Sequence, residues 1–346
     1  MTRARMNERR NRVVCFGELL LRLSSPGREL LLQSPRLDAH FGGAEANVAV
    51  SLARFGHDAA MISIVPSNAL GEAAVAELRR HGVDTHGVAQ RSGRMGLYFL
   101  TPGAVLRPSE VLYDRADSAF ALAAPDTIDW RRVLEGADWL HVSGVTPAVG
   151  ERAAAAAQRA AQVAAEMNVG LSFDGNYRER LWSQWDGDRA TILRELLGKA
   201  TIAFINEKDV ALALGTRFDH PQIMERRRAA AHAAFAAFPQ LQQIYSTLRD
   251  VQHMQHQDFA SAMFTRNREL HSRSYALHDV VDRIGSGDAF AAGVLHGIIA
   301  AYEDQQILEF ATAAAAFKHS VPGDFNLVRV EDVRQLLDAE GTDVRR

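Results

Sequence analysis

An acidic residue follows two glycines at the end of the segment Asp282–Asp288, which reads Asp-Arg-Ile-Gly-Ser-Gly-Asp. An apolar, strand-like run at 275–281 leads into this segment, and a helix-like run at 289–301 follows it. Glycines at such a junction allow a tight turn, and the exposed N–H groups and the helix dipole predict an anion site suited to phosphate. The N–H groups in question belong to Gly285, Ser286 and Gly287. Asp288 would repel phosphate, so its predicted role is to accept a proton from an attacking hydroxyl. The alternative is a glycine-rich turn capped by an aspartate, without chemistry.

A second polar motif, Gly-Gly-Ala-Glu-Ala-Asn at 42–47, precedes a run of apolar residues at helical spacing that ends at Gly56. Paired glycines allow a ligand to approach the backbone closely, and the side chains of Glu45 and Asn47 suit sugar hydroxyls. The candidate sugar contacts here are Gly42, Gly43, Ala44, Glu45 and Asn47. Taken alone, the motif could be only a loop and a helix cap.

The composition is typical of a globular chain with a large core. The 346 residues are 47% hydrophobic and 23% charged. A formal net charge of −3 does not favour a nucleic-acid-binding surface. The run 289–301 is too short to span a membrane, so no membrane partner is expected. The only cysteine, Cys15, excludes an intrachain disulfide and is typical of a cytoplasmic protein. The basic segment 1–12 lacks the apolar region of a signal peptide and is expected to be a disordered tail.

Strand-like and helix-like segments alternate along the rest of the chain. Strands are expected at 13–16, 59–65, 139–143, 170–174, 202–206, 243–248 and 275–281. Helices are expected at 44–55, 71–81, 151–168, 189–197, 208–214, 223–238, 289–302 and 305–319. This alternation predicts a doubly wound α/β fold over residues 13–340, with a mainly parallel sheet and helices on both faces. Ligands bind beyond the carboxyl ends of such strands, where both polar motifs fall. Two strands near 96–100 and 111–115 break the alternation and predict a hairpin, which could also be a surface feature without function.

Together, the motifs at 42–47 and 282–288 resemble the paired signatures of the ribokinase-like sugar kinases, also called the phosphofructokinase B type. The resemblance extends from about Val13 to about Val333. It implies ATP and Mg²⁺ as cofactors and a sugar hydroxyl as the acceptor. It also implies that strands near 94–116 form a small β-sheet lid that closes over the sugar and excludes water. Exposed lid edges could pair with a second subunit, so a homodimer or higher homo-oligomer is expected.

Within that family, several segments are similar to those of 2-keto-3-deoxygluconate kinases, namely Gly96–Phe99, Tyr113–Arg115, Ser143–Ala148 and Asp174–Trp182. By position, the resemblance implies substrate contacts from Gly43, Tyr98, Tyr113, Arg115 and Arg178, the last against substrate or nucleotide phosphate. A guanidinium group at Arg115 pairs well with a carboxylate, which a neutral sugar lacks. Two alternatives stay open: a kinase for a neutral sugar (fructose, ribose) or a nucleoside, and a non-catalytic sugar-binding regulator. Asp288 and the intact glycines argue against the regulator.

The nucleotide side is less specific. The resemblance implies nucleotide or magnesium contacts from Asn176, Asn206, Asp209, Thr247, Arg249 and Asp282, and no residue is assigned as a direct metal ligand. The family's glycine-containing ATP loop is missing after Ser246, so the adenine contacts are unassigned. Residues 249–258 are expected to form a solvated loop, because the histidines at 253 and 256 lack the partners of a metal site.

Overall fold

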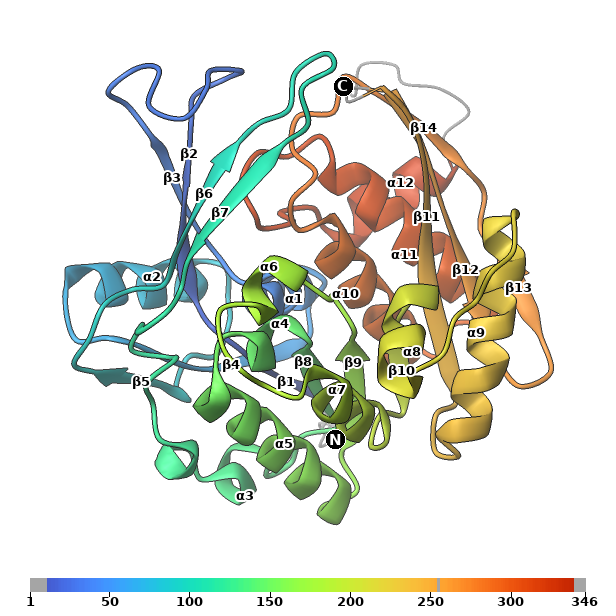
Figure 1. Cartoon of the computed structure of the whole chain (residues 1–346), viewed down its shortest axis with the longest axis horizontal. Helices are drawn as coiled ribbons and strands as arrows, with labels where there is room; N and C mark the ends of the chain where they lie inside the picture. Colours follow the sequence, from blue (N-terminus) through green and yellow to red (C-terminus); the bar gives the residue numbers. More distant parts are fainter. Residues whose placement is uncertain (1–10, 254–255, 339–346) are drawn as a thin grey trace, which may run out of the picture.

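The computed structural model describes residues 11–253 and 256–338. The described residues form a ten-stranded sheet, a separate four-stranded sheet, and helices packed around them (Figure 1). Most of the basic tail predicted at 1–12 lies outside the described residues. Arg12, however, is the first residue of a strand, where its side chain pairs with Asp58 and Asp84.

The large sheet has the strand order β13-β12-β11-β10-β9-β8-β1-β4-β5, with β14 paired to β12. Its strands are β1 (Arg12–Phe16), β4 (Asp58–Pro66), β5 (Val88–Arg91), β8 (Trp139–Ser143), β9 (Gly170–Asp174), β10 (Ile202–Phe204), β11 (Gln243–His253), β12 (His256–Phe264), β13 (Glu269–His271) and β14 (Tyr275–His278). Strands from β5 across to β11 pair in parallel, and β12, β13 and β14 pair antiparallel. The predicted mainly parallel sheet is confirmed.

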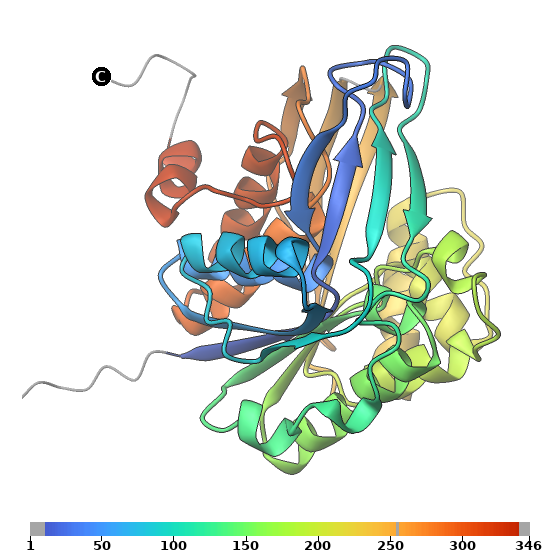
Figure 2. The same cartoon turned by 90° about the vertical axis from the view of Figure 1, so that its left-hand side faces the viewer.

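Helices cover both faces of this sheet (Figure 2). Val14 and Phe16 of β1 pack into one apolar cluster, and Val13 and Cys15 pack into another, as the alternation of side chains along a strand requires. One cluster includes α1 (Ala44–Arg54), α2 (Ala69–Arg80), α10 (Ser286–Ile299), α11 (Asp304–Lys318) and α12 (Val330–Asp338). The other face carries α3 (Trp130–Val133), α4 (Val145–Ala148), α5 (Glu151–Glu166), α6 (Glu179–Trp182), α7 (Arg189–Leu197), α8 (Glu207–Leu214) and α9 (Ile223–Ala237). No helix of the described part of the chain is both long enough and apolar enough to cross a membrane.

Two predictions about the sheet were wrong. The strand predicted at 275–281 ends at His278 and pairs antiparallel with β12, because Asp279 adopts a left-handed conformation (φ 53°) that a strand cannot continue. Within the described residues, the solvated loop predicted at 249–258 is instead the outer part of β11 and β12, which pair through Arg249↔Phe259 and Asp250↔Asp258. A polar run gives no apolar periodicity there, yet its backbone groups are satisfied by the neighbouring strand. Residues 254 and 255 of that prediction lie outside the described residues.

The second sheet has the order β3-β2-β6-β7 and rises away from the large sheet (Figures 1 and 2). Its strands are β2 (Leu20–Ser24), β3 (Asp38–Gly42), β6 (Leu97–Thr101) and β7 (Glu110–Asp114). We call these strands, with the connecting loops 25–37 and 102–109, the lid. The hairpin predicted near 94–116 is confirmed as β6 and β7, whereas β2 and β3 were missed because β3 reads Asp-Ala-His-Phe-Gly, without clear alternation.

Helix α10 lies unusually close to α11 at Gly293. A Cβ atom at this position would lie 2.6 Å from the Cα of Ala311. Gly293→Ala should therefore lower the free energy of unfolding by about 1–3 kcal/mol, because the clash is with backbone rather than with a flexible side chain. The matched control is Gly287→Ala in the same helix, where a Cβ would meet nothing within 4 Å. That control should raise stability by up to about 1 kcal/mol. Equal effects of both substitutions in chemical denaturation would contradict the close helix contact.

Candidate active site

The turn before α10 has the geometry of an anion site. Gly285 is the helix N-cap and has a φ of 79°, which favours glycine. A side chain there would also collide with the carbonyl oxygen of Asp324, 2.0 Å from the Cβ position. No side chain caps the helix, so its positive end faces the cavity that Ser286 and Gly287 line. We call residues 281–287 the anion turn.

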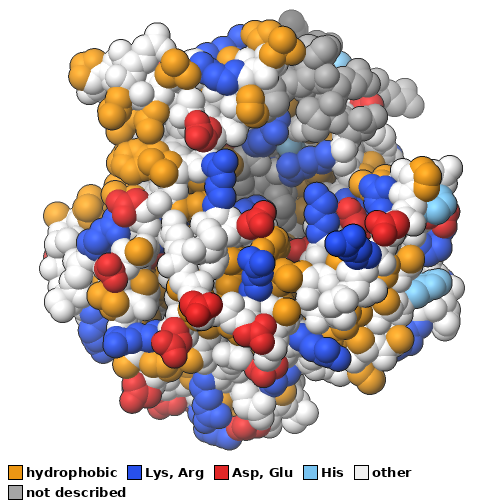
Figure 3. All heavy atoms as spheres, in the orientation of Figure 1, with side chains coloured by type: hydrophobic (Ala, Val, Ile, Leu, Met, Phe, Trp, Pro, Cys, Tyr) orange, Lys and Arg blue, Asp and Glu red, His pale blue; other side chains and the backbone are white. Residues whose placement is uncertain are grey.

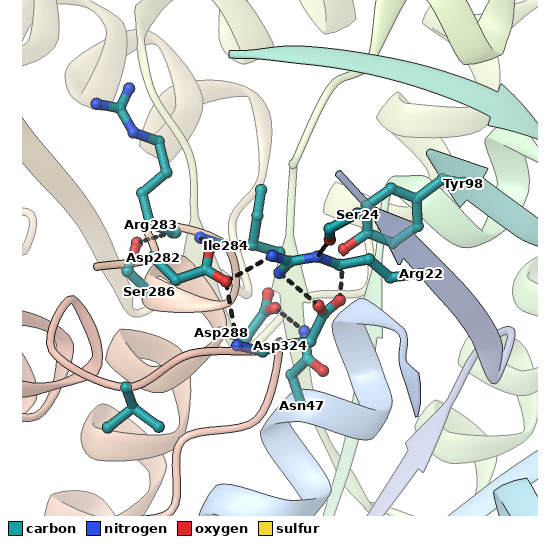
Figure 4. A network of polar contacts seen from close by, with 12 residues as sticks. Arg22, Ser24, Asn47, Tyr98, Asp282, Arg283, Ile284, Ser286, Asp288 and Asp324 are labelled. Carbon is teal, nitrogen blue, oxygen red and sulfur yellow. Dashed lines mark hydrogen bonds and ion pairs between the residues drawn. The ribbon is translucent and has the colours of Figure 1, made fainter. Parts of the chain in front are cut away.

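Asp288 lies in the first turn of α10 and is only 8% exposed. Its Oδ2 accepts a hydrogen bond from Nδ2 of Asn47, at 2.6 Å (Figure 4). Burial raises the pKa of the Asp288 carboxyl to about 7, although the Asn47 hydrogen bond acts in the opposite direction. A carboxyl group that titrates near neutrality is suited to general-base catalysis. The same hydrogen bond joins α1 of the first motif to α10 of the second.

A cavity of about 870 Å³ opens above this carboxylate, between the lid and the carboxyl ends of the parallel strands. Lysine and arginine side chains gather around the hollow on this face (Figure 3). Most predicted site residues line the cavity: Gly43, Ala44, Asn47, Tyr98, Tyr113, Arg115, Asn176, Arg178, Asn206, Asp209, Thr247, Arg249, Gly285, Ser286, Gly287 and Asp288. Residues from the lid, from both signatures, from the segments after β9 and β10, and from β11 therefore meet at one place.

Three predicted site residues do not line the cavity: Gly42, Glu45 and Asp282. Gly42 packs against Asp324, whose Oδ2 would lie 2.2 Å from a Cβ at position 42. Glu45 is buried and its Oε1 accepts hydrogen bonds from the backbone N–H and the hydroxyl of Ser143 and from the hydroxyl of Thr146. These hydrogen bonds fix the connection between β8 and α4, so the side chain of Glu45 does not face the cavity. The sequence could not show this, because a side chain at a helix N-terminus can face either a ligand or the interior with the same sequence pattern.

Arg115 lines the cavity but already has an anionic partner. Its Nε donates to Oε2 of Glu18 at 2.5 Å, and both side chains are buried. Oε1 of Glu18 accepts a second hydrogen bond, from the hydroxyl of Ser118. Glu18 was not singled out in the sequence, because an acid between β1 and β2 gives no periodic signal. Its pairing fixes the guanidinium group of Arg115 and balances its charge.

A buried ionic network beneath the anion turn was also missed (Figure 4). Arg22 of β2 pairs with Oδ2 of Asp282 at 2.7 Å and with Oδ1 of Asp324 at 3.0 Å. The hydroxyl of Tyr98 donates to Oδ2 of Asp324 at 2.7 Å. Asp282 also accepts from the backbone N–H groups of Ile284 and Gly323. The sequence feature that could have revealed this network is the arginine inside the apolar strand Leu-Leu-Arg-Leu-Ser, because arginine is rarely buried without a partner.

The residues predicted to contact the nucleotide line the cavity from the start of α8 and from β11. Asn206 and Asp209 form a reciprocal capping box at the start of α8. Burial raises the pKa of the Asp209 carboxyl to about 6. Nη2 of Arg249 donates to the hydroxyl of Ser286 at 2.7 Å, which places a cation at the anion turn. Arg227 was missed; its Nη1 donates to the hydroxyl of Ser246 and, at 2.5 Å, to the carbonyl oxygen of Thr247. No cluster of three or more potential metal ligands occurs among the residues that the structure describes.

Comparisons with known proteins find similar proteins over nearly the whole chain. The model of the pfkB family carbohydrate kinases matches residues 10–328. A 2-dehydro-3-deoxygalactonokinase from Haloferax volcanii is 31% identical over 334 residues, which cover 94% of this chain and 96% of that protein. The crystal structure of a 2-dehydro-3-deoxygluconokinase from Thermotoga maritima has a TM-score of 0.89 at 36% identity and covers 95% of this chain and 100% of that chain. That of a pfkB family carbohydrate kinase from Listeria grayi has a TM-score of 0.88 at 33% identity, with coverage of 95% and 100%.

The hydrogen bond from Asn47 should control the titration of Asp288. The carboxyl should titrate near pH 7 in the wild-type protein, and Asn47→Ala should raise that pKa further, because the bond favours the charged form. The measurement is a ¹³C NMR titration of labelled aspartate carboxyl groups, with Asp288→Asn used to assign the signal. A pKa in the ordinary range of an aspartate, or no change in Asn47→Ala, would contradict the burial argument.

Proposed function

The chain belongs to the pfkB family of carbohydrate kinases and is an ATP-dependent sugar kinase, and we propose that its acceptor is 2-keto-3-deoxygluconate, also called 2-dehydro-3-deoxygluconate. The product is 2-keto-3-deoxy-6-phosphogluconate, formed by phosphorylation of the primary hydroxyl. The observation that carries the phosphotransfer chemistry is the buried carboxyl of Asp288 at the open N-terminus of α10, because burial raises its pKa to about 7. The similar proteins from Haloferax volcanii and Thermotoga maritima support the choice of a 3-deoxy keto-acid sugar.

The chemistry follows from the positions of these groups. Asp288 accepts the proton of the primary hydroxyl of the sugar. The oxygen of that hydroxyl forms a bond to the γ-phosphorus of ATP, and the bond from this phosphorus to the bridging oxygen of the leaving ADP breaks. Asn47 holds the carboxylate in orientation through its 2.6 Å hydrogen bond. The N–H groups at Ser286 and Gly287, together with Arg249, face the charge on the transferred group. Phosphoryl transfer needs this positioning and neutralisation more than covalent catalysis.

Magnesium is part of the proposal because the donors near the phosphates suit it. Asp209 and Asn206 line the cavity while their side chains cap α8, and carboxylate and amide oxygens are donors that Mg²⁺ prefers while it keeps several waters. These residues would hold the ion through water rather than in a closed protein cage. When bound, Mg²⁺ supplies charge neutralisation on the β- and γ-phosphates. Arg178 lines the same cavity and is positioned to contact either a phosphate or the acid group of the sugar.

The lid supplies the proposed sugar contacts Tyr98, Tyr113 and Arg115. Arg115 is the physical reason to prefer an acidic sugar, yet the Glu18 carboxylate balances its charge at 2.5 Å. This pairing supports a second candidate, a neutral sugar such as fructose or ribose. The acid remains the better candidate, since a guanidinium group bonded through Nε keeps further N–H donors for a second acceptor.

The proposal includes a homodimer or higher homo-oligomer formed through the lid. Large apolar side chains are exposed on its strands and loops, and many lie at its tip (Figure 3): Leu30, Leu32, Val105, Leu106 and Leu112. A contiguous group of exposed apolar side chains is typical of a protein–protein contact.

The proposal also places the enzyme in the cytoplasm, where ATP is available and a buried free thiol such as Cys15 stays reduced.

Removal of the proposed base should abolish most of the turnover. Asp288→Asn keeps the shape and the bond to Asn47 but cannot accept the proton, so kcat should fall by about 10²–10⁴-fold. The wild-type kcat/KM should rise with pH through about 7, because only the ionised carboxylate is active. A coupled ADP-release assay with 2-keto-3-deoxygluconate and Mg²⁺ measures both. If the variant kept more than half of the wild-type kcat, a residue other than Asp288 would have to be the base.

A comparison of substrates should reveal what Arg115 recognises. If Arg115 pairs with the carboxylate of the sugar, Arg115→Ala should lower kcat/KM for 2-keto-3-deoxygluconate by about 30-fold or more, and that for fructose far less. Arg115→Lys should recover only part of the loss, because a point charge does not replace the planar fork.

The matched control is the double variant Arg115→Ala/Glu18→Gln. It removes the unpaired buried carboxylate that the single variant leaves behind. Equal losses for acidic and neutral sugars in this double variant would show that Arg115 supports the lid, and the neutral-sugar candidate would then be preferred.

A further inference from the structure

Lys318, the last residue of α11, is fully buried beneath the anion turn. Lysine is almost never buried without a partner, because its ammonium group loses its hydration. Its Nζ donates a hydrogen bond to the carbonyl oxygen of Val321 at 2.9 Å. Its side chain also reaches Gly285, since a Cβ at that glycine would lie 3.4 Å from Cε of Lys318. The cation therefore lies between the anion turn and the chain segment 319–324.

The charges around Lys318 require a second cation. The buried carboxylates of Asp282 and Asp324 share one guanidinium group, that of Arg22. Burial lowers the pKa of Lys318 and Arg22 acts in the same direction, while the carboxylates of Asp282, Asp324 and Asp288 oppose this effect. With Lys318 charged, the carboxylates of Asp282 and Asp324 are balanced by two cations, Lys318 and Arg22, and Asp288 is a further acid nearby. Without the charge on Lys318, a net negative charge would remain directly below a turn that has to bind phosphate.

The segment 319–324 supports the anion turn through its backbone. The carbonyl oxygen of His319 accepts hydrogen bonds from the N–H groups of Val281 and Asp282, and the N–H of Gly323 donates to Asp282. The carbonyl oxygen of Asp324 packs against Gly285. A displacement of this segment would therefore move the N–H groups that face the phosphate.

We infer that Lys318 is a positioning residue for phosphoryl transfer, a cation built into the chain that holds the segment 319–324 against the anion turn. The inference rests on the proposed kinase function. Because the chain supplies this cation itself, turnover should not depend on an added monovalent cation.

The test uses Lys318→Met, which keeps the length of the side chain and removes the charge, and Lys318→Arg, which keeps the charge. The kcat of Lys318→Met should fall by about 10²-fold, the usual effect of misplaced reacting groups, with a smaller change in KM. Lys318→Arg should retain more kcat than Lys318→Met. The matched control is Lys199→Met, a partly exposed lysine after α7 that does not line the cavity, and its kcat should equal that of the wild type.

Small cations provide a readout that a purely structural role would not change. Ammonium chloride should restore part of the kcat of Lys318→Met relative to tetramethylammonium chloride at equal ionic strength, and should leave the wild type unchanged. Thermal melting followed by circular dichroism shows whether each variant is folded. If Lys318→Met does not fold, Lys318→Arg and the cation dependence of the wild type still provide the test.

Three results would overturn the inference: a wild-type kcat in Lys318→Met, a loss that Lys318→Arg shares and ammonium does not reduce, or a wild-type enzyme that requires potassium. A wild-type protein that phosphorylates none of the sugars would instead refute the proposed function, so the two failures are distinguishable.

Discussion

In the proposed mechanism a base and a polyanion share one cavity, and that conflict of charge accounts for much of the rest of the site. Asp288 lies at the N-terminus of α10, which is also the proposed phosphate site. Burial raises the pKa of its carboxyl to about 7, so the carboxylate carries less charge near neutral pH than an exposed aspartate would. The helix dipole and Arg249 offset the remaining repulsion from one side. Beneath the anion turn, the positive charges of Arg22 and Lys318 balance the negative charges of Asp282 and Asp324.

The hydrogen bond between Asn47 and Asp288 joins the two parts of the chain on which this arrangement depends. The two residues are 241 positions apart in the sequence, and they meet because α1 and α10 pack on the same face of the sheet. Glu45, two residues before Asn47 on α1, fixes the start of that helix to Ser143 and Thr146. The orientation of the base is thus set by the packing of α1 against both β8 and α10. A local motif could not provide this.

The sequence predicted those helices and strands in which burial of one face makes apolar residues recur at regular spacing. The bounds of β8, β9 and α7 agree with the prediction, because each has a regular apolar pattern and clear ends. The outer halves of β11 and β12 were taken for a loop, since backbone pairing alone holds them and leaves no pattern in the residues. In the site, glycines and acids with fixed spacing located the anion turn and Asp288. Glu18, Arg227 and Asp324 were not found, because their partners are distant in sequence and only the fold brings them together.

The ionic contacts also limit how the lid can move. Arg22 and Tyr98 belong to lid strands, yet both bond to Asp324 beneath the anion turn, and Arg115 at the end of β7 pairs with Glu18. To separate a buried ion pair costs about 3–5 kcal/mol, because each charge loses its partner without regaining water. The base of the lid is therefore fixed to the main domain, and the closure over the sugar that we propose would come from bending of the outer strands and from the loops 25–37 and 102–109. Those loops carry the exposed apolar side chains, so a partner subunit that covered them would act on the part of the lid that is free to move.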